Sequence, residues 1–485
     1  MLGSSFYFYR RTKTRESFHL AGRGLNSWVA GFSASFSGMS GWMLIGYTGI
    51  SYLLGPSIFW MMTSYLVGVT FGYTVYGSRL RNYSEILGAV TYPEFFARRV
   101  RDETNIIRLI GATATVFFMA VYVGSQYVSG AIALSPLLNI SYNSAMILTF
   151  VGVTLYCLTG GLNAVAWLDY FRGIAIIIIT IISAYMLLKL GGGWSASINK
   201  IGQISPNLVN VSMGGKVGAA LIGAVLAQIS LAGGTVGRPH DTIRFFAIDS
   251  SKEVPKARFI GVTSLAIPYF TCFMIGYLGR IFFPTLDKHE QIFPMLMQQV
   301  FHPFWSGLLL VGLVAFVMTT VDSQLLSAAS SVAEDFYRPF FNPNASDQTL
   351  VMVSRIAVLL VSVVGLVFGM TTPDTMFWFT IYAGNGLACT FLSVLILSLY
   401  WKGLTKWGVA AGMVTGFLTT VIWYNMGWRI IMNEVIPGHV FSCLAAVIVS
   451  LITANSIKEH HAKISAEIEL AKGLYSHDKF EHYYE

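Results

Sequence analysis

Apolar stretches long enough to cross a bilayer recur along this chain of 485 residues, with short polar segments between them. A membrane-spanning α-helix needs roughly 20 apolar residues, and most elements of soluble domains are shorter. The pattern predicts an all-α polytopic membrane protein. We expect about twelve full transmembrane helices, at residues 27–53, 57–77, 107–135, 143–161, 163–190, 217–236, 258–283, 305–333, 350–370, 376–401, 407–425 and 437–455.

The N-terminal segment is apolar at residues 2–9 but too short to span the bilayer. It lacks the charged start and the cleavage pattern of a signal peptide. We expect a shortened helix there, followed by a basic loop that completes residues 1–26.

Two of the predicted spans carry small and polar residues at membrane depth. Residues 33–41 of the first span are mostly serine, glycine and alanine, and a similar cluster runs from Gln228 to Pro239. Such helices can break, which a membrane tolerates only where the break faces protein or a water-lined cavity. Interrupted spans at matching positions of two halves indicate a transporter binding site, with close helix packing through small residues as the alternative.

Basic residues are distributed unevenly between the predicted loops. Because successive spans cross the membrane in opposite directions, 24 of the 31 Lys and Arg residues fall on one side of the membrane and 6 on the other. The remaining one, Arg172, lies near the inner end of a span. The richer side is expected to be cytoplasmic, and it includes the C-terminal tail at 456–485. Membrane orientation therefore accounts for the net charge of +8, and we expect no nucleic-acid partner.

The composition excludes several classes of protein. Hydrophobic residues make up 54% and charged residues 11%, where soluble domains carry about 25% charged residues. No polar stretch is long enough for a separate catalytic or nucleotide-binding domain. The four cysteines lie in apolar segments without metal-binding spacing, and no nucleophile–base set is recognisable, so we do not expect an enzyme.

Two carboxylates, Asp169 and Asp322, lie inside long apolar stretches. A carboxylate at bilayer depth costs at least about 2.5–3.5 kcal/mol on insertion scales and usually marks an ion or proton pathway. Asp322 has no basic residue within a turn or two of its own helix, which favours an ion ligand; Asp169 could instead pair with Arg172. Hydroxyl groups flank Asp322, at Thr319, Thr320 and Ser323. Oxygen-only sites of low charge suit sodium better than calcium.

Several motifs resemble the sodium/solute symporter family, and its sodium/proline symporter branch most closely. They are Gly-Met-Ser-Gly-Trp at 38–42, Gly-Gly-Leu-Asn-Ala-Val-Ala-Trp-Leu-Asp at 160–169, Arg-Pro-His at 238–240 and Met-Thr-Thr-Val-Asp-Ser-Gln-Leu-Leu at 318–326. The resemblance implies a leucine-transporter-like core of two inverted five-helix repeats, here 27–190 and 217–401, followed by two additional helices at 407–455.

The resemblance also implies ion and substrate sites. One sodium would bind the main-chain carbonyls of Phe36, Met39 and Phe316 and the hydroxyls of Thr319 and Thr320. A second sodium, found in some members, would use Asp169, Thr319, Asp322 and Ser323. The substrate would lie near Ser37, Ser40, Trp42, Tyr122, Leu231, Thr235, Pro239 and Asn385. The aromatic residues Trp42, Tyr122 and Tyr382 could equally be ordinary core or interface residues.

This chain departs from the proline-transporting relatives at a few of these positions. They usually carry Asp where this chain has Gly38, and aromatic residues where it has Leu231 and Thr235. Arg238 stands where an amide is usual. We interpret it first as a positive loop charge, with pairing to a substrate carboxylate as the alternative.

The functional hypothesis is a sodium-coupled symporter of the cell (inner) membrane. It would import a small organic solute, with an amino acid such as proline as the first candidate. Sodium, the substrate and the lipid bilayer are the expected partners. The alternatives are a symporter-like nutrient sensor, a symporter for another small carboxylate, and an uncoupled sodium pore.

Overall fold

The computed structural model describes residues 15–158, 162–212, 215–371 and 375–473, so the predicted helix at 2–9 lies outside the described residues. Most of these residues are helical. An isolated parallel β-bridge joins Leu25 to Ile248. The helices at the predicted spans are α3 (Ser27–Phe36) with α4 (Ser40–Trp42) and α5 (Thr48–Leu54), α6 (Phe59–Phe71) with α7 (Ser78–Ile86), α9 (Ile106–Leu138), α10 (Tyr142–Cys157), α11 (Leu162–Leu190), α13 (Gly218–Ser230), α15 (Val254–Phe282), α17 (Pro303–Ser330), α19 (Asp347–Thr371), α20 (Met376–Tyr400), α21 (Lys406–Asn425) and α22 (Val435–Ile452).

Every predicted span coincides with a helix, and the all-α fold class is confirmed. Within the described residues, ten helical runs are long and apolar enough to cross a membrane. One of these runs, Ser40–Ile86, covers two predicted spans. The chain turns between them at Gly55, whose combination of φ +55° and ψ −141° favours glycine. The apolar helix α10 is shorter, at 16 residues.

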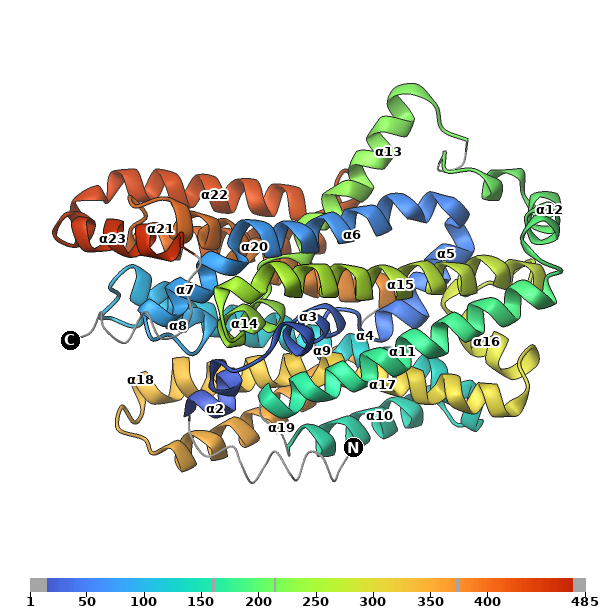
Figure 1. The fold of residues 1–485 in the computed structure, drawn as a ribbon, viewed down its shortest axis with the longest axis horizontal. Coiled ribbons are helices and arrows are strands. Elements are labelled where there is room, and N and C mark those ends of the chain that lie inside the picture. The colour runs from blue at the N-terminus through green and yellow to red at the C-terminus, as the bar shows by residue number, and fades with distance from the viewer. Residues whose placement is uncertain (1–14, 159–161, 213–214, 372–374, 474–485) are drawn as a thin grey trace.

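The long helices lie side by side, and short helices cap both ends of the bundle (Figure 1). At one end lie α2 (Arg15–Leu20), α8 (Tyr92–Arg99), α14 (Pro239–Ala247), α18 (Arg338–Phe340) and α23 (His461–Ala471); at the other lie α12 (Trp194–Ile204) and α16 (Ile292–Gln299). The first group lies in loops that are expected in the cytoplasm, and the second group lies in loops that are expected outside. The two ends of the bundle therefore match the two sets of predicted loops. Which end faces the cytoplasm stays a prediction.

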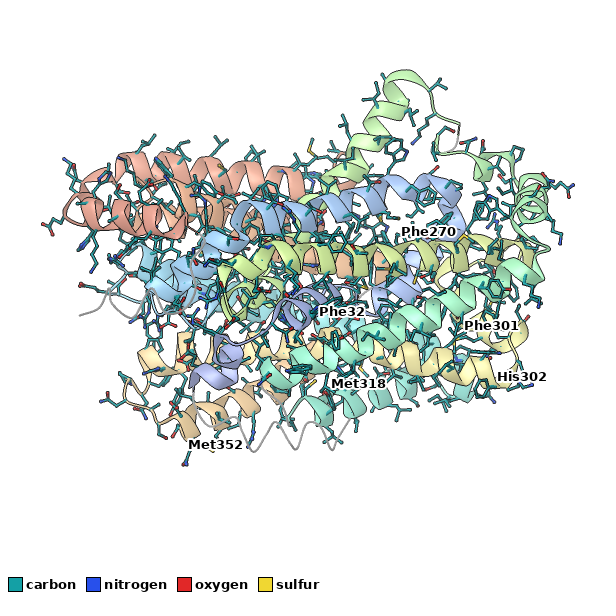
Figure 2. The ribbon with its side chains drawn as sticks, in the orientation of Figure 1. Phe32, Phe270, Phe301, His302, Met318 and Met352 are labelled. Carbon is teal, nitrogen blue, oxygen red and sulfur yellow. The ribbon has the colours of Figure 1, made fainter. Side chains whose placement is uncertain are left out.

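The helices α3 and α4 lie in the middle of the bundle. The first contacts α15, α11 and α14, and the second contacts α17 and α9. Phe32 of α3 and Met318 of α17 are labelled near the centre of Figure 2, whereas Phe301 and His302 mark one end and Met352 the other. The residues of the predicted ion site therefore lie at mid-depth.

Glycine permits a very close contact between α15 and α5. A Cβ added to Gly276 would lie 2.1 Å from the carbonyl oxygen of Thr48 and 2.9 Å from the Cβ of Ser51. The first of these is a backbone atom, so it cannot rotate away.

We expect Gly276→Ala to destabilise the protein by about 1–3 kcal/mol, because α5 and α15 would have to separate. Gly152→Ala on α10 is the matched control, since an added Cβ there meets nothing within 4 Å. Its effect should be neutral or slightly stabilising. Thermal unfolding of the two purified variants measures the difference, and equal melting temperatures would contradict this account of the packing.

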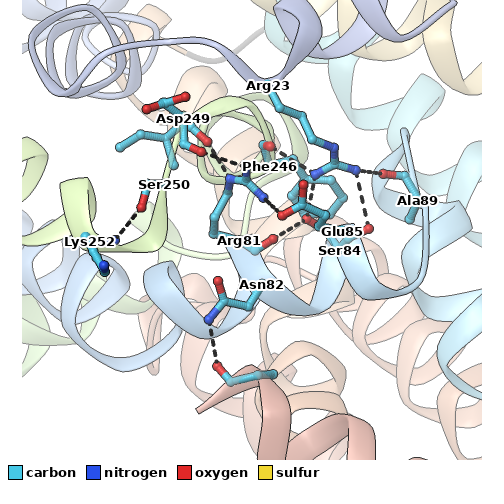
Figure 3. A network of polar contacts seen from close by, with 12 residues as sticks. Arg23, Arg81, Asn82, Ser84, Glu85, Ala89, Phe246, Asp249, Ser250 and Lys252 are labelled. Carbon is cyan, nitrogen blue, oxygen red and sulfur yellow. Dashed lines mark hydrogen bonds and ion pairs between the residues drawn. The ribbon is translucent and has the colours of Figure 1, made fainter. Parts of the chain in front are cut away.

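A polar network ties three segments together at the end of the bundle that holds α14 (Figure 3). Arg23 donates to the carbonyl oxygens of Ala89 at 2.8 Å and Phe246 at 3.1 Å. Arg81 of α7 pairs with Glu85 at 2.6 Å and donates to the Asp249 carbonyl at 2.8 Å. Burial, and secondarily the nearby Arg81, lowers the pKa of Arg23 to about 10, so Arg23 stays charged at neutral pH.

The β-bridge completes this network. The Leu25 N–H donates to the Ala247 carbonyl at 3.1 Å, and the Asp249 N–H donates to the Leu25 carbonyl at 2.9 Å. The segment that precedes α3 is thereby joined to the segment that follows α14.

Candidate functional site

The first helix is broken where the sequence predicts it. Helix α3 ends at Phe36, whose carbonyl accepts the Met39 N–H at 3.1 Å, and the helix resumes at Ser40, which has a φ of +52°. Beyond the break, the Gly41 N–H donates to Gln126 Oε1 of α9 at 2.9 Å, and the Trp42 N–H donates to Ser40 Oγ at 3.0 Å. Side chains therefore satisfy two of the main-chain donors that the break sets free.

The second break also lies where it is expected. Helix α13 continues as a 3₁₀ turn, Leu231–Thr235, before α14 begins at Pro239. Between them, Gly237 has a φ of +74° and donates its N–H to the Tyr76 hydroxyl at 3.2 Å. Its missing side chain leaves room for Leu392 of α20, which lies 2.9 Å from where a Cβ would be.

The residues of the first predicted sodium site lie on α17 and at the first break. Phe316, Thr319 and Thr320 are fully buried. Thr319 Oγ1 donates to the Phe316 carbonyl at 2.9 Å, and Thr320 Oγ1 has no hydrogen-bond partner among the described residues. A Cβ added to Gly41 would lie 3.0 Å from Val317, so α17 packs directly against the break.

Arginine side chains pair with both carboxylates of the second predicted sodium site. Arg172 of α11 lies 2.9 Å from Asp322, and Arg244 of α14 lies 3.4 Å from Asp169. Asp322 has no basic neighbour on its own helix, as the sequence indicates, but it does have a basic partner in the fold. The alternative that pairs Asp169 with Arg172 is wrong, because Arg172 pairs with Asp322 and Arg244 with Asp169. The partner of Asp322 comes from another helix, 150 positions away in sequence.

Arg244 connects several groups of this centre. It donates to Ser33 Oγ at 3.0 Å and Ser323 Oγ at 2.6 Å, and Ser33 in turn donates to Asp169 at 2.8 Å. One oxygen of Asp169 and one of Asp322 have no hydrogen-bond partner among the described residues. Each carboxylate thus retains an oxygen with ligand capacity.

A small cavity lies beside the two breaks, and of the predicted substrate residues only Thr235 lines it. The cavity has a volume of about 40 Å³ and is lined in part by Thr235, Tyr65 and Gly38. Trp42 stacks on Tyr65 with ring centroids 5.4 Å apart. Tyr122 packs edge-on against the His240 ring, with ring centroids 5.6 Å apart.

The remaining predicted substrate residues make other contacts. Ser37 donates to the Ser33 carbonyl at 2.7 Å, and Asn385 donates to Asn433 and Glu434 at 2.9 Å each. Leu231 is buried in the 3₁₀ turn. Pro239 lines a second cavity, of about 30 Å³.

Sequence reasoning missed the role of Arg238 and Asp241 in this centre. Arg238 is only 7% exposed and lines the cavity, so its interpretation as a loop charge is wrong. Asp241 lines the same cavity and pairs with Arg238 at 2.5 Å. The i, i+3 spacing of opposite charges at the start of a helix, directly after a glycine-rich break, is the signal that could have indicated the pair.

Solved structures of membrane symporters share this fold. A Na⁺-coupled sialic acid symporter, solved in a substrate-bound outward-open state, matches with a TM-score of 0.78 at 17% identity over 94% of each chain. Mhp1, a nucleobase-cation-symport-1 family transporter, matches with a TM-score of 0.58 at 13% identity over 93% of this chain and 98% of its own. This chain therefore shares the leucine-transporter-like fold of these two proteins.

The chain belongs to the sodium:solute symporter family, whose model matches residues 18–416. It is 34% identical to the high-affinity proline transporter PutP of Bacillus subtilis, over 93% of this chain and 96% of the relative. It is 31% identical to the osmoregulated proline transporter OpuE of the same organism, over 97% and 96%. A sodium/proline symporter of Staphylococcus aureus is also 31% identical, over 92% and 90%.

Family membership confirms the predicted class of function. The protein is a multi-pass membrane transporter and not an enzyme, and it imports a small solute by sodium-coupled symport. Sodium is the coupling ion that the family implies.

Proposed function

We infer that this protein imports a small amino acid, L-proline before others, together with sodium across the cell (inner) membrane. The observation that carries the inference is the break between α3 and α4, which packs against the buried hydroxyl-bearing face of α17 at mid-depth. Three similar proteins, of which the match covers 90–96% of the length, are named as proline transporters, which supports this choice of substrate.

One sodium would bind between the broken helix and α17, at the carbonyls of Phe36, Met39 and Phe316 and the hydroxyls of Thr319 and Thr320. The free hydroxyl of Thr320 supports this assignment, because a buried hydroxyl without a partner is costly unless a ligand satisfies it. The Phe36 carbonyl, at the end of α3, accepts the Met39 N–H and keeps a second lone pair for an ion.

For a second sodium the support is weaker. Asp169 and Asp322 each have a guanidinium partner, so their charges are balanced without an added cation. We therefore expect coupling to one sodium. If the two ion pairs open in another state of the transport cycle, a second sodium would bind the oxygens of Asp169, Thr319, Asp322 and Ser323.

The mechanism that follows is alternating access between two inverted repeats, residues 27–190 and 217–401. Sodium would hold the first broken helix against α17 and so preorganise the substrate cavity beside both breaks. The richer basic loops and the C-terminal tail would face the cytoplasm. Each sodium entering down a potential of ~100 mV supplies about 2.3 kcal/mol, in addition to its concentration gradient.

Uptake of radiolabelled L-proline into proteoliposomes tests this function. With an inward sodium gradient we expect accumulation above equilibrium, and with potassium in place of sodium we expect none. Binding of proline without accumulation would favour a nutrient sensor. Sodium-dependent thermal stabilisation without any proline effect would remove proline as the substrate and keep the symporter.

A further inference from the structure

An ion pair lies in the cavity between the two helix breaks. Arg238 holds Asp241 Oδ2 through both Nε, at 2.6 Å, and Nη2, at 2.5 Å. The second carboxylate oxygen of Asp241 lies 3.4 Å from Ser37 Oγ of the first broken helix and 3.4 Å from His240 Nε2. Both members of the pair line the cavity, so a bound solute would meet a positive and a negative charge side by side.

Glycine makes room for this pair at the first break. A Cβ on Gly38 would lie 2.7 Å from Arg238 Nη2 and 3.4 Å from Asp241 Oδ1. On the opposite side, Arg238 Nη1 lies 3.5 Å from where a Cβ of Gly384 on α20 would be. The guanidinium thus fills the space that a side chain at position 38 would otherwise take, and Asp241 supplies the carboxylate there.

The broken helix offers few main-chain donors for a substrate carboxylate. Gln126 and Ser40 already accept the N–H groups of Gly41 and Trp42. Arg238 is the cation that lines the cavity, so it is the group best placed to bind an anion. The ring nitrogens of His240, next to the pair, also lack hydrogen-bond partners among the described residues.

We propose that Arg238 and Asp241 separate when substrate binds and hold the carboxylate and the ammonium group of a zwitterionic amino acid, respectively. In the empty cavity the two residues neutralise each other. This assignment rests on the proposed amino-acid transport, and it extends to zwitterions other than proline.

The charge balance explains why a zwitterion fits and a singly charged solute does not. A monocarboxylate that takes Arg238 leaves Asp241 without a cation in a buried cavity, and an amine that takes Asp241 leaves Arg238 without an anion. An unpaired buried charge is strongly unfavourable, so each of these solutes loses affinity. A zwitterion replaces one ion pair with two and leaves neither residue unpaired.

The test compares three compounds that share a five-membered ring: L-proline, cyclopentanecarboxylate and pyrrolidine. Each is added as a competitor of sodium-driven proline uptake, and as a ligand in thermal unfolding of the purified protein in sodium. For the unaltered protein we expect L-proline to act at concentrations about 30-fold or more below those of the two singly charged compounds.

Two neutralising variants should change this selectivity in opposite directions. Asp241→Asn should bring cyclopentanecarboxylate close to proline in potency, and Arg238→Gln should do so for pyrrolidine. A merely structural role would lower all three potencies together. Arg258→Gln on α15 is the matched control, because its guanidinium bonds Thr74 at the exposed surface, away from the cavity. If Arg238→Gln does not fold, Arg238→Lys replaces it in the comparison, because lysine keeps the positive charge.

The outcomes separate this proposal from the choice of proline. If L-alanine or L-serine stabilises the protein and L-proline does not, the proline assignment falls and the charge pair stands. If cyclopentanecarboxylate binds the unaltered protein as tightly as any zwitterion, the charge-pair proposal is overturned while sodium symport stands. Unchanged selectivity in both folded variants would overturn it as well.

Discussion

The variant Thr319→Ala/Thr320→Ala should lose sodium-driven uptake while it remains folded. Both hydroxyls are buried on one stretch of α17 against the first break, and Thr320 Oγ1 has no other partner among the described residues. A bond to a charged group contributes about 1.5–3 kcal/mol, so the loss of two ligands should raise the half-saturating sodium concentration about 100-fold or more. Proline uptake measured against sodium concentration gives this value.

Matched variants separate ligand loss from a packing defect. Thr319→Ser/Thr320→Ser removes two methyl groups and keeps both hydroxyls, so sodium affinity should stay near that of the unaltered protein. Thr180→Ala removes a buried hydroxyl that bonds its own helix, at the Ile176 carbonyl of α11, and should leave sodium affinity unchanged. If the double alanine variant shows the original sodium dependence, the ion site between α3 and α17 does not exist.

The variant Arg172→Met should be among the least stable single substitutions in this chain. Arg172 and Asp322 are 2% and 3% exposed, and removal of the arginine leaves a buried carboxylate without its partner. Breaking such a pair costs about 3–5 kcal/mol, whereas replacing both residues by apolar ones is often neutral. Arg172→Met/Asp322→Leu should therefore regain most of the melting temperature that Arg172→Met loses.

Sodium adds a second measurement to this comparison. In Arg172→Met, a sodium ion could take the place of the arginine as the partner of Asp322. The melting temperature of this variant should therefore change more than that of the unaltered protein when sodium is exchanged for potassium. Lys472→Met is the control, because Lys472 and Glu469 form an exposed pair whose loss should cost about 1 kcal/mol or less. If Arg172→Met melts like this control, the buried pair does not stabilise the fold.

The positions of the helices were predictable because the bilayer fixes the length of an apolar helix. The two breaks were predictable for a related reason: serine and glycine at 33–41 and between Gln228 and Pro239 are too polar or too small for an ordinary span. Local composition carries both signals, so no knowledge of neighbouring helices was needed.

The partners of the buried charges could not be predicted in the same way. Arg172 and Asp322 lie 150 positions apart, and Arg244 and Asp169 lie 75 apart, so only the packing of α11, α14 and α17 brings them together. Arg238 was misinterpreted because a basic residue after a span usually lies in a loop. Here Arg238, at the start of the short helix α14, lines the buried cavity, and its guanidinium occupies the space beside Gly38.

The β-bridge between Leu25 and Ile248 constrains how the two broken helices can tilt. It joins Leu25, two residues before α3, to the residue just after α14, and Arg23 donates a hydrogen bond to the Phe246 carbonyl within α14. Because α3 and α14 also contact each other, we expect the halves of the two broken helices at this end to move as one unit. We therefore expect the breaks at 37–39 and 236–238 to bend together, so that the ion site and the charge pair open and close in a single step.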